Sequence, residues 1–167
     1  GNATDFGNLT VARYANGSQA VANTTRGVFC GGVASAGDTM DYITILSAGN
    51  ATDFGNLTAD TYSLSTACSI VRGRIFSGVG RSQAIDYITI ATPGNSLDFG
   101  DLTATVTGTS AASNNTRGLF SGGWSGGQIN DMSYVTIATT GDATTFGNLT
   151  TSQSLRGGAS QSMAAVQ

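Results

Sequence analysis

The sequence contains no histidine, no lysine and no glutamate, and these absences limit the chemistry that the chain can perform. Its seven positive charges are all arginines, and its ten negative charges are all aspartates. Histidine is the commonest general base and metal ligand, and without it neither a Ser–His nor a Cys–His nucleophile pair can form. We therefore do not expect an enzyme. The net charge of −3 comes without any basic block, so we do not expect a protein that binds nucleic acid either.

Long apolar runs are missing too, and the chain has only one proline and two cysteines. No stretch approaches the length of a membrane span and no cleavable targeting segment is visible. We therefore expect no membrane partner, and a leader that has been removed or never existed. When the internal repeats are aligned, Cys30 and Cys68 fall at positions that hold alanine or serine in other units. This favours two buried thiols over a disulfide between them.

The residues that are abundant favour strands and turns. Glycine accounts for 24 of the 167 residues, and hydrophobic residues make up 40% of the chain, which is enough for a core. Strong helix formers are nearly absent, whereas threonine, isoleucine, valine, tyrosine and phenylalanine fill the short apolar runs. The composition predicts an all-β protein, and the length suits a single domain.

One ten-residue motif organises the whole chain. GNATDFGNLT stands at residues 1–10 and again, letter for letter, at 49–58, and weaker copies begin at residues 94 and 141. A period of about 47 residues is typical of a repeat architecture. We divide the single domain into terminal strands and three complete repeats: 1–10, 11–58, 59–103, 104–150 and 151–167.

Each repeat contains four short elements, which we expect to be antiparallel strands. The first three elements lie at 12–23, 61–70 and 105–114, at 26–32, 72–80 and 117–123, and at 41–45, 86–90 and 133–137, and the fourth is the motif itself. In the third element, Tyr42 and Thr44 alternate with Asp41, Ile43 and Ile45, which predicts a half-buried strand.

A Gly-Gly pair follows the second element. Gly31 and Gly32 end the strand of the first repeat, and Gly122 and Gly123 end that of the third. Such pairs predict a turn that needs a positive φ or a close approach of the backbone.

This pattern resembles a kelch repeat. That family has a strand ending in Gly-Gly, then strands with aromatic residues and an arginine soon after, which Tyr42, Phe54 and Arg13 match. The resemblance implies a β-propeller of four-stranded antiparallel blades. The chain departs from the family in having phenylalanine for the outer-strand tryptophan, and Gly78-Val79 in place of the second Gly-Gly. The repeat sequence of the chain is also similar to repeats of marine bacteriophage tail-fibre and virion proteins, and this resemblance implies a virion protein.

Three blades and terminal strands do not close an ordinary ring, since propellers have four to eight blades. An open ring would leave bare strand edges and apolar faces, which promote association. We therefore expect a homodimer in which two chains share one ring. A monomeric four-bladed ring and a fragment of a longer chain are the alternatives.

The repeated charged residues are expected to be structural. They are Asp5, Asp53 and Asp98 at one repeat position, and Arg26, Arg72 and Arg117 at another. A catalytic residue is placed once, whereas these recur with the repeat, so we expect turn capping and Arg–Asp pairing. Calcium takes oxygen ligands alone, but no compact run of aspartates appears, so we expect no metal and no cofactor.

One loop breaks the repeat pattern and is the candidate ligand site. Residues 122–131, GGWSGGQIND, hold the only tryptophan, and an exposed Trp124 could stack on a sugar ring. The candidate residues are Trp124, Gln128, Asn130 and Asp131, with Arg81 in the equivalent loop of the second repeat. The alternative is that Trp124 fills a gap between blades or at a subunit junction, which we favour.

These features lead to two functions from different classes. The first is a non-enzymatic structural and interaction module of a virion fibre, with a second copy, other virion proteins or a host-surface glycan as partner. The second is a lectin-like binder that uses the loops between strands. An enzyme on a propeller scaffold is a remote third reading, and fold alone does not decide among them.

Overall fold

The computed structural model describes residues 1–14, 20–33, 37–61, 64–69, 72–76 and 83–154, with residues 72–76 described by their backbone. Within these residues the chain forms twelve strands and no helix. The predicted all-β class is therefore confirmed for the described part of the chain.

The strands form three four-stranded antiparallel sheets, each in sequence order and each inside one repeat. Sheet I contains β1 (Ala20–Ala22), β2 (Arg26–Cys30), β3 (Thr39–Thr44) and β4 (Thr52–Asn56). Sheet II contains β5 (Ser65–Cys68), β6 (Arg72–Phe76), β7 (Ala84–Thr89) and β8 (Leu97–Asp101). Sheet III contains β9 (Ser110–Ser113), β10 (Arg117–Ser121), β11 (Asp131–Thr136) and β12 (Thr144–Asn148). Each of the four elements predicted within each of the three repeats overlaps one strand.

The predicted alternation in the third strand is confirmed. In β3, Met40 and Tyr42 pack into the core that faces sheet II, whereas the Asp41 carboxylate turns to the opposite side and binds Thr10. Ile88 of β7, which occupies the repeat position of Ile43, points back into the core shared with sheet I. Successive side chains of a strand point to opposite faces, so every sheet has one face for the preceding unit and one for the following unit.

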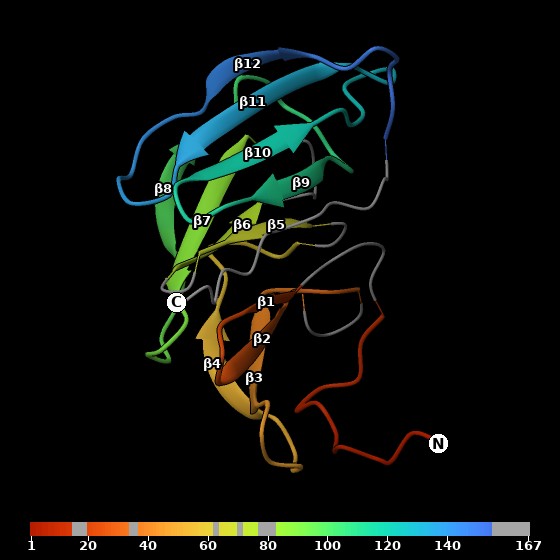
Figure 1. Ribbon diagram of the computed structural model, residues 1–167, viewed down its shortest axis with the longest axis vertical. Coiled ribbons are helices and arrows are strands. Elements are labelled where there is room, and N and C mark those ends of the chain that lie inside the picture. Colours follow the sequence, from red (N-terminus) through yellow and green to blue (C-terminus); the bar gives the residue numbers. More distant parts are fainter. Residues whose placement is uncertain (15–19, 34–36, 62–63, 70–71, 77–82, 155–167) are drawn as a thin grey trace.

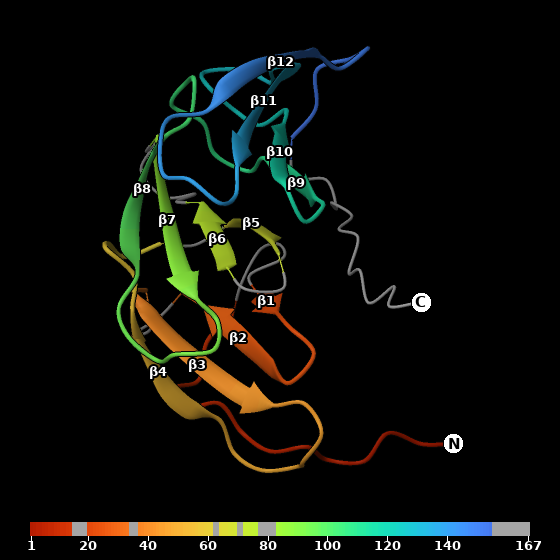
Figure 2. The same cartoon turned by 60° about the vertical axis from the view of Figure 1, so that its left-hand side comes forward.

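The three sheets pack one after another, with sheet II in the middle (Figures 1 and 2). One apolar cluster joins sheets I and II, and it includes Val28, Met40, Phe54, Ile88 and Ile90. A second cluster joins sheets II and III, and it includes Ile85, Phe99, Phe120 and Val135. The apolar core of the described residues therefore consists of two layers between sheets.

The first strands of the sheets lie next to one another, since β5 contacts both β1 and β9. Small polar side chains link them: Thr66 Oγ1 donates to the Ala20 carbonyl at 2.9 Å, and Ser113 Oγ donates to the Cys68 carbonyl at 3.0 Å. The small-residue composition of these strands is explained by this close approach, because larger side chains would separate the backbones.

The fourth strands of sheets I and II each bind a turn of the following sheet. We call β4, β8 and β12 the outer strands, and residues 49–51, 94–96 and 141–143 the docking turns. The Gly94 N–H donates to the Phe54 carbonyl at 2.7 Å, and the Gly141 N–H donates to the Phe99 carbonyl at 2.8 Å. The docking turns therefore extend the packing between sheets with backbone hydrogen bonds.

The glycine of the motif is required at this joint. A Cβ on Gly55, whose φ is 135°, would lie 2.5 Å from the carbonyl of Gly94. A Cβ on Gly100 would lie 2.6 Å from the carbonyl carbon of Gly141. Real Cβ atoms do not approach so closely, so the motif keeps glycine where the backbones meet.

The Gly-Gly pairs also behave as predicted. Gly31 has a φ of 61°, and a Cβ there would lie 2.6 Å from the Thr61 carbonyl. Gly122 has a φ of 63°, and a Cβ there would overlap the Gln153 carbonyl. Gly32 and Gly123 contact the same two carbonyls: the Gly32 N–H donates to the Thr61 carbonyl at 3.0 Å, and the Gly123 N–H donates to the Gln153 carbonyl at 2.7 Å. Gly78 lies outside the described residues.

The N-terminal segment, residues 1–10, differs from the predicted outer strand because no regular strand is formed there. It nevertheless occupies the outer-strand position on sheet I. The Gly49 N–H donates to the Phe6 carbonyl at 2.7 Å, and the Ala51 N–H donates to the Asn8 carbonyl at 2.8 Å. The segment therefore contacts sheet I as β4 contacts sheet II, with no further strands of its own among the described residues.

Candidate functional site

The loop between β10 and β11 presents Trp124 on a fixed backbone. Trp124 and Thr107 exchange backbone hydrogen bonds of 2.8 and 3.1 Å, and a second bridge joins Trp124 to Gln128. The loop turns through Gly126, whose φ is 81°. The Trp124 side chain is 45% exposed, so the indole is partly open to solvent and does not fill an interior gap of the described chain.

The polar residues predicted to accompany Trp124 bind other parts of the chain. Asn148 Nδ2 donates to Asn130 Oδ1 and to Asp131 Oδ1, both at 3.2 Å. Asn130 Nδ2 donates to the Leu149 carbonyl at 3.2 Å. The structure brings Asn130 and Asp131 together, but in a contact that fastens the end of β12. Arg81 lies outside the described residues.

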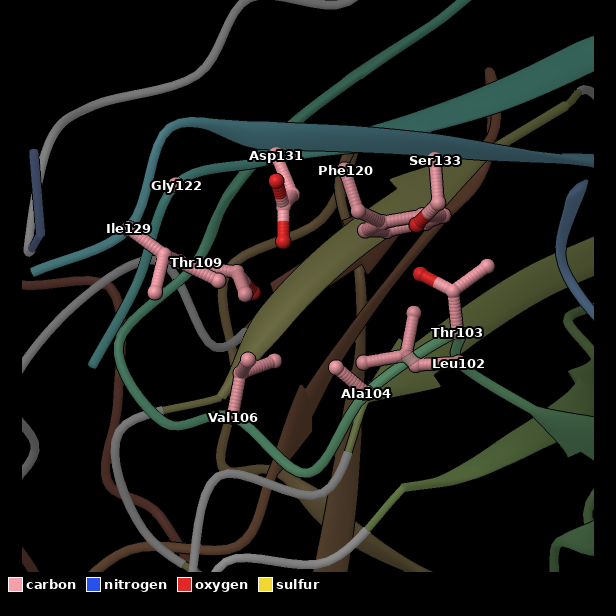
Figure 3. Close-up of a pocket in the computed structure, with 10 residues that line it drawn as sticks. All are labelled: Leu102, Thr103, Ala104, Val106, Thr109, Phe120, Gly122, Ile129, Asp131 and Ser133. Atoms are coloured by element: carbon pink, nitrogen blue, oxygen red, sulfur yellow. The ribbon is translucent and has the colours of Figure 1, made fainter. Parts of the chain in front are cut away.

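A small cavity lies between sheet III and the segment that joins β8 to β9, and the loop that holds Trp124 contributes Gly122 and Ile129 to its wall (Figure 3). Its ten lining residues are labelled in the figure, and the Asp131 carboxylate and the hydroxyls of Thr103 and Ser133 are among them. The cavity measures about 20 Å³, which is room for about one water molecule. It is too small for a sugar ring.

The equivalent place in sheet I is filled by an ion pair. Arg13 occupies the repeat position of Val106, and Asp41 occupies that of Ser133. The Arg13 guanidinium binds the Asp41 carboxylate and donates to the Gly31 and Thr39 carbonyls at 3.0 and 2.8 Å. Both side chains are buried, so this pair is a structural element of the first repeat.

The aspartate of the second repeat binds the outer strand before it. Thr58 donates to the Asp86 carboxylate from its backbone N–H at 3.0 Å and from its hydroxyl at 2.8 Å. Ser96 Oγ donates to the same carboxylate at 2.7 Å. Thr10 makes the corresponding contacts with Asp41. These buried carboxylates thus fasten the motif to the following sheet.

The predicted pairing of the repeated arginines with aspartates is wrong for Arg26. Its guanidinium donates to the Ile90 and Ala91 carbonyls at 3.0 and 2.7 Å, and it lies 4.3 Å from the centre of the Tyr42 ring. Arg117 lies 4.6 Å from the centre of the Tyr134 ring in the same way. The aromatic ring of the third strand therefore takes the place that we assigned to a carboxylate. The side chain of Arg72 is not described.

Turn capping by the motif aspartates is confirmed at two positions. The Gly7 N–H donates to Asp5 Oδ1 at 3.1 Å, and the Gly55 N–H donates to Asp53 Oδ1 at 3.2 Å. Asp98 occupies the equivalent position in β8. A side-chain oxygen that accepts from the N–H two residues later is a common stabiliser of turns.

The two cysteines are thiols and are not joined in a disulfide. Cys30 is fully buried in the cluster between sheets I and II. Burial raises the pKa of the Cys30 thiol from 9.0 to about 12, and the charge of Arg13 offsets only part of that rise. A thiol with so high a pKa is a poor nucleophile at neutral pH.

The two ends of the sheet series expose residues that are buried inside it. Phe54 and Phe99 are 2% and 3% exposed, whereas the equivalent Phe6 and Phe146 are 38% and 53% exposed. Ile45, on the face of sheet I that has no preceding sheet, is likewise exposed, whereas its equivalent Ile90 is buried. The sequence analysis did not predict the docking turns, each of which begins with a Gly-Asn or Gly-Asp pair. Their recurrence with the period of the motif was the signal for docking turns.

The described residues contain no group of three or more acidic, cysteine or histidine side chains that could hold a metal ion. Within the same residues, no helix has the length and apolar character to cross a membrane. Comparison of the chain with protein-family models and with curated proteins finds no match. The functional reading therefore depends on the geometry described above.

Proposed function

We propose that the chain is a non-enzymatic interaction module in which each sheet is one blade of a kelch-like β-propeller, and that a second copy completes the ring. The observation that carries the proposal is the exposure of Phe6 and Phe146 at the two ends of the series. Exposed apolar faces of this kind favour association, and the equivalent Phe54 and Phe99 are buried where a sheet is present on both sides of the joint.

Two further features support blades of a propeller. The sheets are meanders of equal order whose first strands lie side by side, and the outer strands β4 and β8 bind the following sheet. A register shift also recurs at one position of the third strand, between Met40 and Asp41, Ile85 and Asp86, and Met132 and Ser133. Such bulges increase the local twist of a strand, and twisted blades are what a ring requires.

The biological setting in this proposal is the fibre of a virion. It rests on the repeat sequence, TRG-x-F-x-GG followed by DYITI and GNATDFGNLT, and on its resemblance to repeats of bacteriophage tail-fibre proteins. In that setting the module would join copies of itself, or other virion proteins, without performing a reaction.

Substitution of Phe146 by aspartate tests the proposed association. A charge at the exposed end of sheet III opposes burial there, so we expect sedimentation velocity to show loss of the associated species. Leu97→Asp is the matched control, since Leu97 is 57% exposed on the middle sheet, away from both ends. Association that survives Phe146→Asp unchanged would contradict the proposal.

Trp124 supports a second candidate function, the binding of a glycan. A half-exposed indole on a hydrogen-bonded loop is preorganised to stack on a sugar ring. A glycan array with the full chain tests this reading, with Trp124→Ala as the variant and Tyr14→Ala as the control at another exposed aromatic residue. Binding that survives Trp124→Ala, or an array with no binding, rejects this site.

A further inference from the structure

The outer strand β12 carries the same five residues as the N-terminal segment. FGNLT stands at 6–10 and at 146–150, and it also stands at 54–58, where it joins sheet I to sheet II. We propose that β12 docks on the docking turn of sheet I in a second copy, and that the N-terminal segment occupies this turn as a displaceable cap. This inference rests on the proposed function and specifies how the copies would join.

The docking turn of sheet I binds its occupant as the turn of sheet II binds β4. Asn8 N donates to Asn50 Oδ1 at 3.0 Å, and Asn56 N donates to Asn95 Oδ1 at 3.0 Å. The backbone bonds that end at Phe6 and Phe54 are both 2.7 Å long. These contacts use the backbone of the motif, so any strand with the same sequence and backbone fits the same turn.

The backbone of β12 already has the conformation that docking requires. Gly147 has a φ of 150°, close to the 141°, 135° and 142° of Gly7, Gly55 and Gly100. Those three glycines each approach the carbonyl of a docking-turn glycine, whereas the nearest atom to a Cβ on Gly147 is Met132 Cε at 3.8 Å. Among the described residues, the space beside Gly147 is therefore open where its equivalents meet a docking turn.

The side chains of β12 are also compatible with docking. Asn56 Nδ2 donates to Asp38 within sheet I while its backbone binds the turn of sheet II. Asn148 Nδ2 makes the corresponding contacts with Asn130 and Asp131 in sheet III. Its backbone N–H thus has the same position relative to its sheet as that of Asn56.

The N-terminal segment and β12 differ in what lies behind them. The N-terminal segment forms no regular strand and has no sheet of its own among the described residues. The strand β12 belongs to a four-stranded sheet, and it would bring the partly buried Leu119 and Met132 to the joint together with Phe146. Burial of this larger apolar face favours exchange of the cap for a second copy.

Valine substitutions at the two motif glycines test the proposal in the full chain. Gly7→Val places a side chain against the Gly49 carbonyl and weakens the cap, so we expect the association constant to rise about tenfold as more chains become competent to bind. Gly147→Val places the same clash on the docking strand, so we expect association to be lost. Circular dichroism of both variants checks that the sheets are retained.

A peptide of sequence GNATDFGNLT, added to the Gly7→Val chain, provides an independent readout. It should bind the vacated turn and reverse association in sedimentation velocity, whereas the control peptide GNATDFVNLT should do neither. Peptide binding together with the two opposite valine effects supports the cap.

Other results separate the two proposals. If the chains associate but Gly7→Val and the peptide change nothing, the cap is wrong and the proposed self-association stands. If wild-type and Gly7→Val chains are both monomeric at every concentration, the cap and the proposed self-association fall together.

Discussion

The joints inside the molecule and the faces at its ends use the same motif with different results. At the two inner joints, the motif phenylalanines Phe54 and Phe99 are buried by the next sheet. At the ends, Phe6 and Phe146 remain exposed, although their strands have the same local sequence. Burial of the motif phenylalanine therefore requires both its own sheet and the following sheet. Within the described residues, the N-terminal segment lacks the first and β12 lacks the second.

The largest expected effect separates the two kinds of phenylalanine directly. Phe54→Ala removes a fully buried ring from the core between sheets I and II, and we expect a loss of about 3–5 kcal/mol in the free energy of unfolding. Phe146→Ala at the exposed end should cost less than about 1 kcal/mol in the isolated chain. Urea unfolding of both variants checks this, and equal losses would show that the end face is already covered.

The second prediction concerns the buried Arg13–Asp41 ion pair, which lies where the N-terminal segment meets sheet I. Asp41→Asn leaves the Arg13 guanidinium buried without its counter-charge, and we expect a loss of about 3 kcal/mol in unfolding free energy. Asp142→Asn is the control, because an exposed amide oxygen can still accept from the Asp101 N–H. Urea unfolding again measures both variants, and an Asp41→Asn chain as stable as the control would contradict the structural role of the pair.

The third prediction uses the buried thiol of the first joint. The folded chain holds the Cys30 pKa near 12, above the 9.0 of an ordinary cysteine, so only the unfolded chain releases this proton between those values. The contribution of Cys30 is therefore complete below about pH 9 and is lost as the pH rises toward 12. Thermal melts of wild-type and Cys30→Ala chains across this range should converge with rising pH, and parallel curves would contradict the shift.

The smallest expected effect also lies at the joint between sheets I and II, where the Gly32 N–H donates to the Thr61 carbonyl. Thr61 occupies the repeat position of Arg13 and Val106, and within the described residues its buried hydroxyl has no hydrogen-bond partner. Thr61→Val removes that polar group, so we expect the free energy of unfolding, measured by thermal denaturation, to rise by about 1 kcal/mol. Thr58→Val, which deletes a hydroxyl bound to Asp86, should instead destabilise the chain. A destabilised Thr61→Val variant would mean that the hydroxyl is satisfied in solution.

The strands and their order could be predicted because each depends on local sequence repeated three times. Alternation in DYITI placed Tyr42 and Asp41 on opposite faces, and the Gly-Gly pair marked the close approach at Gly31. Repetition averages over local exceptions, since a pattern present in three units is unlikely to arise by chance in each.

The partners across the joints could not be predicted, because they depend on contacts between units. Arg26 was expected to bind an aspartate, but it lies over the Tyr42 ring and donates to the Ile90 and Ala91 carbonyls that follow β7. At the loop of the third repeat, Asn130 and Asp131 were expected to serve a ligand together with Trp124, but they bind Asn148 of β12. Sequence separation hid both contacts, since the residues involved are brought together only by the packing of strands.

The mass of the full chain in solution tests the central claim most directly. Light scattering should be recorded on material freshly eluted from a sizing column, over a series of increasing concentrations. We expect a mass that rises from the 16.8 kDa of one chain toward about twice that value. A mass of one chain at every concentration would contradict the proposal that a second copy covers the exposed ends.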